Sequence, residues 1–296
     1  MAVVHVIGVG KMGLPMALHL RAAGHAVTVS DPDSERIALA VAQGLAAAPD
    51  TARAIAGAEV VLSSLPHDAA LRAVGQQVAG AAKAGLVYID TSTASQQASA
   101  DVAALCAAAG VHYLRCTVSG NNKMAEAAQL TVMASGPREA YDRMLPLLKA
   151  FGPNHFYLGA AEEARLMKLV VNLMIAQTSA MLSEALALGR KGGLDWQDMW
   201  QVLGASAVAS PILKAKSAQL ALRDFTPTFT VEQMLKDLDL ILEAGRRTHV
   251  PLAQTALTHQ LMHAALAQGD GLDDYAAIIK AVERSAGLAT DTGVAT

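Results

Sequence analysis

Three glycines near the start of the chain have the spacing of a dinucleotide-binding turn. They follow the apolar stretch 3–9, precede a predicted helix, and form the run Gly8-Val9-Gly10-Lys11-Met12-Gly13. In such a turn the first glycine permits a sharp bend, the second lets the backbone approach a pyrophosphate, and the third allows the helix to pack closely on the strand. The N–H groups at the helix N-terminus then donate to the phosphates. The pattern predicts a pyrophosphate site, and the alternative is a glycine turn in an α/β sheet that binds no ligand.

An acidic residue follows this loop at the distance that ribose recognition requires. Asp31 ends the second predicted strand, 18 residues after Gly13. A carboxylate at this place accepts hydrogen bonds from the adenosine ribose and repels the 2′-phosphate of NADP. Asp33 and Glu35 add negative charge, whereas Arg36 could turn toward a phosphate. We therefore expect NAD to be preferred to NADP.

Two polar residues interrupt an otherwise apolar helical stretch. Within residues 166–175 only Lys168 and Asn172 are polar, and their spacing places both side chains on one face of a helix. Burying an ammonium group is costly unless it is paired or its pKa falls, and a lysine with a lowered pKa can exchange protons near neutral pH. Interconversion of a carbonyl and an alcohol needs such a group. The alternative is a lysine that reaches solvent from the start of the helix, with an asparagine packed beside it.

The elements that must position these residues change in character along the chain. Up to residue 162, short strand-like stretches alternate with helical segments, which is typical of a parallel sheet covered by helices on both faces. The strands are predicted at 3–9, 26–30, 60–65, 86–90, 113–117 and 130–134. We predict an α/β fold with two domains: a Rossmann-type doubly wound sheet over residues 1–162 and an all-α domain over residues 163–296.

A long helix predicted over residues 164–191 joins the two predicted domains. It is apolar on nearly every face, so we expect it to be buried, in part against a second subunit. Further helices are predicted at 195–203, 211–222, 231–247, 252–267 and 275–285. In one of them His259 and His263 are spaced like zinc ligands, but Gln260 replaces the glutamate of a metalloprotease and no third ligand is apparent. We expect no metal.

Composition narrows the classes of function. Hydrophobic residues make up 53% of the 296 and charged residues 17%, so the chain can bury a large core. A net charge of −3, no long basic run and 4% aromatic residues argue against nucleic acid as a partner. The uncharged stretch 169–183 is too short for a typical membrane span of ~20 residues, and no signal peptide is apparent. These observations argue against membrane binding. Cys106 and Cys116 suggest no disulfide framework, so we expect a cytoplasmic protein.

A series of motifs beyond the glycines resembles the β-hydroxyacid dehydrogenase family, which includes 3-hydroxyisobutyrate dehydrogenase and tartronate semialdehyde reductase. They occur in the family's order between positions 8 and 238. The motifs are Met12-Gly13 with Pro15-Met16-Ala17, Gly24-His25, Leu65-Pro66, Asp90-Thr91-Ser92-Thr93, Val118-Ser119-Gly120, Lys168 with Asn172, and Phe229 with Lys236-Asp237-Leu238.

This resemblance implies a function and a set of site residues. The implied activity is reversible oxidation of a small β-hydroxy acid to its semialdehyde or keto acid, in a homodimer or homotetramer. Lys168 would be the catalytic acid/base, and Asn172 would hold substrate together with Ser119, Gly120 and Asn121. The implied cofactor-binding residues are Gly8, Gly10, Lys11, Met12, Gly13, Asp31, Leu65, Pro66, Thr93, Phe229 and Lys236.

Two other functions stay open. An imine reductase shares this architecture but usually carries another residue in place of Lys168. A non-catalytic dinucleotide-binding interaction module also tends to lose that lysine. The lysine therefore favours carbonyl chemistry.

The substrate loop departs from the family's pattern. Asn121, Met124 and Ala128 stand where the family has glycines, as do Glu162 and Ala164 before the long helix. Asn121 adds volume and an amide beside Ser119, so we expect a substrate larger or more polar than 3-hydroxyisobutyrate. The alternative is that Asn121 only adopts a left-handed backbone conformation, which asparagine tolerates well.

Overall fold

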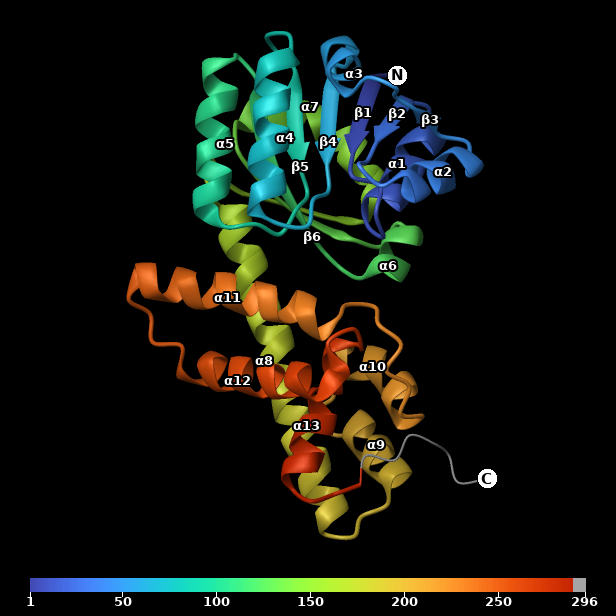
Figure 1. The fold of residues 1–296 in the computed structure, drawn as a ribbon, viewed down its shortest axis with the longest axis vertical. Coiled ribbons are helices and arrows are strands. Elements are labelled where there is room, and N and C mark those ends of the chain that lie inside the picture. The colour runs from blue at the N-terminus through green and yellow to red at the C-terminus, as the bar shows by residue number, and fades with distance from the viewer. Residues whose placement is uncertain (290–296) are drawn as a thin grey trace. The chain divides into compact units, whose positions relative to one another are not determined.

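The computed structural model describes residues 1–289, which form two compact units (Figure 1). Unit 1 comprises Met1–Lys168, and unit 2 begins at Leu169. Helix α8 (Glu163–Lys191) starts in the first unit and continues in the second. Residues 290–296 of the predicted all-α domain lie outside the described part of the chain.

Unit 1 is built on one sheet whose strands follow the order β3-β2-β1-β4-β5-β6-β7-β8. The strands are β1 (Val3–Ile7), β2 (Ala26–Ser30), β3 (Ala46–Ala47), β4 (Val60–Ser63), β5 (Val87–Asp90), β6 (His112–Ser119), β7 (Thr131–Ser135) and β8 (Asn154–Gly159). All neighbouring pairs are parallel except β6 and β7. The first six strands have the order of a Rossmann fold, which confirms the predicted fold class.

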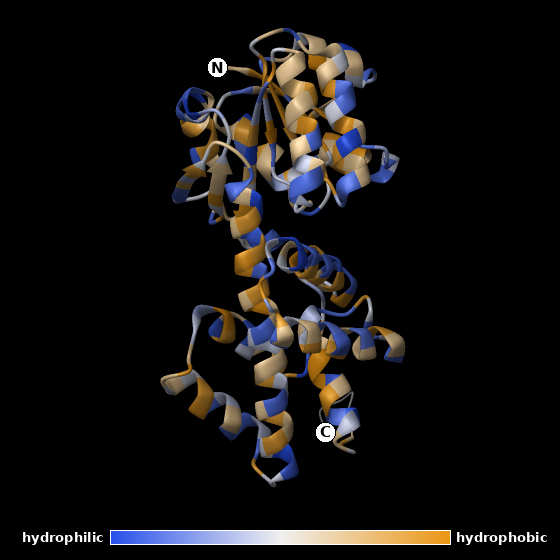
Figure 2. Ribbon diagram, turned by 90° about the vertical axis from the view of Figure 1, so that its left-hand side faces the viewer, coloured by the Kyte–Doolittle hydropathy of each residue, from blue (hydrophilic) through white to orange (hydrophobic). Residues whose placement is uncertain are grey.

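Helices cover both faces of this sheet, because the strand residues are apolar on both sides (Figure 2). One core cluster packs α1, α2 and α7 on the sheet, and a second packs α3, α4 and α5 on the opposite face. The helices are α1 (Gly13–Ala22), α2 (Ser34–Ala42), α3 (Thr51–Gly57), α4 (Asp68–Ala81), α5 (Gln96–Ala108), α6 (Asn122–Glu126) and α7 (Arg138–Leu148), with a 3₁₀ turn η1 (Lys149–Phe151).

The order of the strands reverses at β1, and this reversal locates the candidate site. Residues Ile7, Ser63 and Asp90 end β1, β4 and β5 in register with one another. The loops that leave these strands therefore emerge at the same edge of the sheet. In open α/β sheets, ligands bind outside the carboxyl ends of the strands at such a reversal.

Unit 2 contains only helices and a single β-bridge among its described residues. After α8 come α9 (Trp196–Ala205), α10 (Pro211–Ala221), α11 (Val231–Thr248), α12 (Ala253–Ala265), a π-helical turn η2 (Leu266–Asp270), a 3₁₀ turn η3 (Tyr275–Ala277) and α13 (Ile278–Ser285). One core cluster joins α8 to α11, α12 and α13, and another joins it to α9, α10 and α13.

Helix α8 is less buried than its composition predicts. Met174, Met181 and Leu188 are 61%, 64% and 76% exposed, so one apolar face of the helix is open in the single chain. The helices of unit 2 cover only part of the circumference of α8, so burial of the remaining face against a second subunit stays a prediction. By length and composition, α8 is the one helix within residues 1–289 that could cross a membrane, but core helices of soluble proteins have the same properties.

Candidate functional site

Two glycines of the loop after β1 are required by the packing of the protein itself. Gly8 has φ +89°, and a Cβ there would lie 2.4 Å from the carbonyl oxygen of Ser64. A Cβ on Gly13 would lie 1.9 Å from the carbonyl oxygen of Gly8. These positions permit the turn and the close approach of α1, as the spacing predicts.

Gly10 differs from Gly8 and Gly13. A Cβ at this position would meet only the guanidinium group of Arg36, at 3.4 Å, so no packing inside the chain requires glycine here. Met12, the N-cap residue directly before α1, forms no side-chain capping hydrogen bond, and the first turn of the helix contains no acidic residue. The positive end of the helix and an open backbone therefore lie together, which fits the pyrophosphate of a dinucleotide.

Asp31 is tied directly to the glycine loop. Its carboxylate accepts hydrogen bonds from the backbone N–H groups of Val9 and Asp33, both at 2.9 Å, and the side chain is 2% exposed. A carboxylate can accept about four hydrogen bonds, so capacity for ribose hydroxyls remains. Arg36 lies 3.8 Å from Asp31 and 3.3 Å from Asp33, with a side chain that is 54% exposed.

The loops after β4 and β5 are joined through one serine. The Ser92 hydroxyl accepts a hydrogen bond from the Leu65 backbone N–H at 2.8 Å and donates to Asp90 Oδ1 at 2.6 Å. Pro66 and Thr93 follow Leu65 and Ser92 directly in the chain. These residues of the predicted cofactor site thus lie in two connected loops at the sheet edge that carries the glycine loop.

The predicted substrate loop begins where β6 ends. Gly120 has φ +136°, and a Cβ there would lie 2.7 Å from a side-chain carbon of Leu130. Asn121 has φ −100° and caps α6, since its Oδ1 accepts a hydrogen bond from the Met124 N–H at 3.0 Å. The left-handed conformation considered for Asn121 is therefore wrong: asparagine is used here as a helix cap.

The first turn of α8, which leads to Lys168, packs on the sheet near this loop. Thr117 of β6 donates a hydrogen bond from its hydroxyl to the carbonyl oxygen of Ala164 at 2.9 Å. The Ala164 N–H donates to the Ser135 hydroxyl of β7 at 3.2 Å. Ala164 is fully buried, so the alanine in place of a family glycine is accommodated. Unit 1 therefore brings the helical turn before Lys168 against the strand that leads to Ser119.

The other predicted site residues belong to unit 2. Asn172 is buried and donates a hydrogen bond from its Nδ2 to Asp237 Oδ2. Lys236 Nζ lies 3.0 Å from the other oxygen of Asp237. The ring of Phe229 packs edge-on against Tyr275, with centroids 6.3 Å apart. Asn172, Asp237 and Lys236 are thus brought together, and Asp237 holds the amide orientation of Asn172.

A buried charged pair at the sheet edge was missed by the sequence analysis. Arg165, in the first turn of α8, forms an ion pair with Asp90, and both side chains are 0% exposed. A second pair joins the buried Arg115 of β6 to the partly exposed Glu162, just before the helix. The available signal was a charged residue at the head of an apolar helix, because residues of this type are almost never fully buried unless paired.

Comparisons with known proteins agree with this architecture. Residues 3–159 match the family described as the NAD binding domain of 6-phosphogluconate dehydrogenase, and residues 163–282 match the NAD-binding family of NADP-dependent 3-hydroxyisobutyrate dehydrogenase. The chain is 33% identical over 291 residues to 2-(hydroxymethyl)glutarate dehydrogenase of Eubacterium barkeri, covering 97% of each protein. The chain belongs to the β-hydroxyacid dehydrogenase family.

The family descriptions and the dehydrogenase names of the relatives make this β-hydroxyacid dehydrogenase an NAD(P)-dependent enzyme, and solved structures share its fold. The Mycobacterium tuberculosis 3-hydroxyisobutyrate dehydrogenase with L-serine has a TM-score of 0.87 and 28% identity, with coverage of 95% of this chain and 99% of that one. An imine reductase from Pseudomonas sp. has a TM-score of 0.62 and 23% identity over 95% of this chain and 99% of that one, a likeness of fold alone. The chain is thus an NAD(P)-dependent oxidoreductase of this family.

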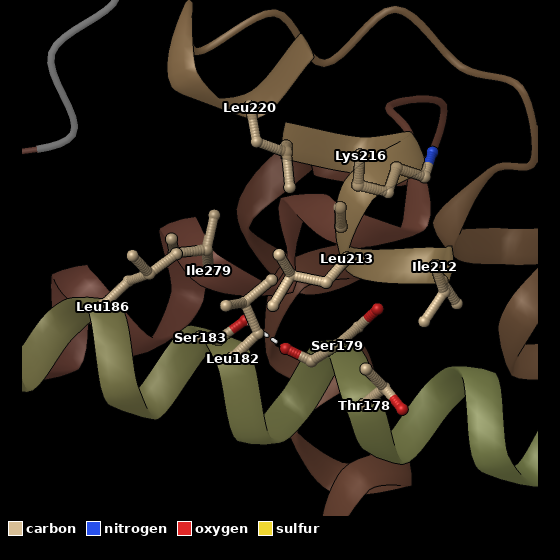
Figure 3. Close-up of a pocket in the computed structure, with 11 residues that line it drawn as sticks. Thr178, Ser179, Leu182, Ser183, Leu186, Ile212, Leu213, Lys216, Leu220 and Ile279 are labelled. Carbon is tan, nitrogen blue, oxygen red and sulfur yellow. Dashed lines mark hydrogen bonds between the residues drawn. The ribbon is translucent and has the colours of Figure 1, made fainter. Parts of the chain in front are cut away.

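Two further places in this dehydrogenase lack the properties of a ligand site. A small cavity in unit 2 admits one water molecule at most, because the volume open to the centre of a water-sized sphere is about 10 Å³. It is lined by Ala276 and by the residues labelled in Figure 3, which are Thr178, Ser179, Leu182, Ser183, Leu186, Ile212, Leu213, Lys216, Leu220 and Ile279. The rings of His259 and His263 lie 4.5 Å apart, but no cluster of three metal-ligating side chains occurs within residues 1–289.

Proposed function

We propose that this protein reversibly oxidises a small β-hydroxy acid to its semialdehyde or keto acid, with Lys168 as the general acid/base. The observation that carries the proposal is the placement of the first turn of α8 on β6 and β7, beside the strand that leads to Ser119. A bound nicotinamide ring supplies or accepts the hydride. Lys168 then donates a proton to the developing alkoxide during reduction and removes it during oxidation.

Substrate binding is assigned to the loop after β6 and to Asn172. The hydroxyl group of Ser119 and the backbone N–H groups of Gly120 and Asn121 bind the substrate carboxylate. Asn172 offers its carboxamide oxygen, because its nitrogen already donates to the buried Asp237. The same buried carboxylate keeps this amide from rotating, which orients the substrate for hydride transfer.

The cofactor is assigned to the glycine loop and to both connected loops of unit 1. Gly8, Gly10, Lys11, Met12 and Gly13 form the pyrophosphate turn. Leu65, Pro66, Thr93, Phe229 and Lys236 would also hold the cofactor. NAD is preferred to NADP, because the nearly buried Asp31 carboxylate is fixed beside the loop and repels a 2′-phosphate.

The preferred substrate is a β-hydroxy acid with a further polar group. Asn121 uses its carboxamide oxygen as a helix cap, so its Nδ2 group is left to donate to substrate. Lys123, two residues further on, is exposed and adds positive charge to the loop. The name of the Eubacterium barkeri relative describes a substrate with a second carboxylate, which agrees with such donors.

We assign the protein to the cytoplasm as a homodimer or homotetramer. Met174, Met181 and Leu188 recur at seven-residue intervals and form one exposed apolar face of α8. A seven-residue repeat places these side chains along one seam, as in paired helices. Met181→Lys should shift the particle toward the monomer in size-exclusion chromatography with light scattering, and an unchanged mass would contradict this use of the α8 face.

Turnover with a panel of substrates tests the proposed function. The panel contains 3-hydroxyisobutyrate, a dicarboxylic β-hydroxy acid and a cyclic imine, each with NAD and NADP. We expect oxidation of hydroxy acids, best with the dicarboxylate and NAD. Lys168→Ala should lower kcat by about 10²- to 10⁴-fold with little change in cofactor affinity, because it removes the proton donor. Retention of more than about a tenth of kcat would exclude this role.

The specificity assigned to Asn121 has its own test. Asn121→Gly should relax selectivity toward simple β-hydroxy acids, since a site that bonds a polar substrate group discriminates against analogues without it. Unchanged selectivity would leave Asn121 with the capping role alone. Asn121→Asp keeps the cap but removes the amide donor, so its selectivity should also relax, and unchanged selectivity would show that the amide does not contact substrate.

A further inference from the structure

Arg165 lies in a fully buried polar network at the carboxyl ends of β4 and β5, together with Tyr113 near the start of β6. Its Nη2 group donates to Asp90 Oδ2 and to the Tyr113 hydroxyl, the latter at 2.9 Å. Its Nη1 group donates to the backbone carbonyl oxygen of Ser92. The guanidinium group therefore bonds to three different acceptors, on β5, on β6 and in the loop after β5.

Asp90 connects this arginine to the loops of the proposed cofactor site. Its second oxygen, Oδ1, accepts hydrogen bonds from Ser63 at 2.5 Å and from Ser92 at 2.6 Å. Ser92 in turn accepts from the N–H of Leu65. A single carboxylate thus links the start of α8 to the ends of β4 and β5 and to the loop that carries Leu65 and Pro66.

The stability of the fold does not explain this arrangement. Desolvating both charges is costly, and apolar residues of similar volume often hold such a contact as well or better. The Nε group of Arg165 also has no hydrogen-bond partner within residues 1–289, which adds to the cost. The pair has a property that an apolar contact lacks, because a planar guanidinium group fixes direction as well as distance.

That direction is transmitted to Lys168 through the helix. Residues three apart lie on neighbouring positions of one helical face, about 4.5 Å apart along the axis. Fixing the guanidinium group of Arg165 against Asp90, Tyr113 and Ser92 therefore fixes the rotation of α8 about its axis at the position of Lys168. The long lysine side chain is flexible, so the accuracy of its ammonium group depends on its base.

We propose that Arg165, held by Asp90, is a positioning residue for Lys168. This inference rests on the proposed role of Lys168 and adds that the buried ion pair sets the location of that side chain relative to the cofactor loops. A displacement of about 1 Å at a catalytic group can cost about 100-fold in rate. The Arg115–Glu162 pair holds the residue that directly precedes α8, with Glu162 in place of a family glycine.

The test removes the pair without leaving a buried charge. In the double variant Arg165→Met/Asp90→Asn, methionine fills the volume of the arginine stem, and the asparagine oxygen can still accept from Ser63 and Ser92. Active sites are counted by titration with cofactor, and kcat is calculated per cofactor-binding site. We expect kcat to fall about 100-fold while the Kd of the cofactor and the KM of the substrate change less than about threefold.

Lys168→Ala is measured in parallel so that two failures can be told apart. If Lys168→Ala is inactive and the double variant retains kcat, the positioning role is overturned and the proposed function stands. If Lys168→Ala retains kcat, the proposed role of the lysine is wrong, and the positioning role falls with it.

A conservative variant covers the case in which the double variant does not fold. Arg165→Lys keeps a positive charge opposite Asp90 but cannot bond to three acceptors in a plane. We expect kcat to fall about tenfold at unchanged KM, and wild-type kcat would overturn the positioning role.

A buried pair outside the proposed site serves as the matched control. Lys216 and Asp274 of unit 2 form an ion pair with side chains 12% and 1% exposed. Lys216→Met/Asp274→Asn should leave kcat per cofactor-binding site unchanged. An equal loss of kcat in both double variants would show a general effect of removing buried charges, and would overturn the specific role of Arg165.

Discussion

Both units bury charged side chains, but they do so in different ways. In unit 1, Asp90 and Arg165 are both 0% exposed. In unit 2, Glu283 is also 0% exposed, but its two partners, Arg190 and Arg223, keep 20% and 17% of their side-chain surface. Both arginines also contact the ring of Trp196, at 5.8 and 5.1 Å from its centroid.

This difference separates two uses of the same chemistry. The arginines of unit 2 remain partly hydrated, so their pairing with Glu283 costs less desolvation and joins α8, the end of α10 and α13. The pair of unit 1 gives up all hydration at the edge where the cofactor loops and α8 meet. We therefore infer that the Glu283 cluster of unit 2 contributes stability, whereas the Asp90–Arg165 pair of unit 1 has the proposed orienting role.

Glu283→Gln should give the largest difference between an effect on stability and an effect on kcat. The change leaves two arginines without their counter-charge, and loss of one partner of a buried pair costs about 3 kcal/mol or more. We expect the free energy of unfolding in urea to fall by about this amount, while kcat per cofactor-binding site stays at the wild-type value. A fall in kcat without loss of stability would contradict the assignment of this cluster to stability.

Acidification should destabilise the protein through a histidine in the middle of the unit 1 sheet. His5 is fully buried between Thr28 and Ser30, at 2.9 and 3.1 Å from their hydroxyl oxygens. Burial lowers the pKa of His5 from 6.5 to about 4, although the hydrogen bond with Thr28 opposes the shift. Below pH 6.5 the unfolded chain therefore binds a proton at His5 that the folded protein does not bind. The contribution of neutral His5 to the free energy of unfolding is thus present above pH 6.5 and is lost as the pH falls toward 4.

The expected loss from His5 is about 2 kcal/mol between pH 7.5 and pH 5. Urea unfolding of the wild type and of His5→Gln at both pH values measures it. The variant lacks the titrating group, so its stability should depend less on pH in this range. Parallel losses in the two proteins would show that other groups cause the acid sensitivity.

Substitution by glycine at a strained backbone position should change the free energy of unfolding by a smaller amount, and in opposite directions in the two units. Ala128 in unit 1 and Arg223 in unit 2 have φ values of +52° and +54°, which glycine adopts more readily. Ala128→Gly should raise the free energy of unfolding by about 1 kcal/mol, since it relieves strain and removes only a methyl group. Arg223→Gly should lower it, because the ion pair with Glu283 is lost. Stabilisation by both variants would show that the Glu283 pairs contribute little.

An exposed ion pair beside the glycine loop should have the smallest effect. Arg36 is 54% exposed and lies near Asp31, so it can partly offset the repulsion of a 2′-phosphate. Arg36→Ala should lower kcat/KM with NADP about fivefold more than with NAD, and should leave the melting temperature almost unchanged. Arg72→Ala, which breaks an exposed pair with Asp101, is the control. Equal effects on both cofactors would show that Arg36 does not face the phosphate.

Much of the fold follows from local patterns in the sequence. The glycine spacing predicts the turn after β1, and the alternation of strands and helices predicts the mostly parallel sheet. Strands β3 and β8 were not predicted, because the first contains two residues and the second is an edge strand with alternating exposure. The local signal is weak in both cases, and pairing with a neighbour decides the structure.

Contacts between distant segments limit how much of the candidate site can be predicted from the sequence. Asp90 and Arg165 are separated by 75 positions, and no local pattern relates them. The role of Asn121 as a helix cap was within reach, since asparagine before a short helical stretch is a favoured cap. The assignments of Lys168, of the substrate residues and of the cofactor residues stay predictions, because their function depends on bound ligands.

The Asp90–Arg165 pair also bears on where this protein can be divided. A fragment that ends with β8 would contain every strand of the sheet, but Asp90 would be a buried carboxylate without its cation. Such a charge costs several kcal/mol, comparable to the whole stability of a typical domain. We therefore expect the sheet to fold on its own only when the chain continues through Arg165. Domain exchange between relatives should keep this helical segment with the sheet.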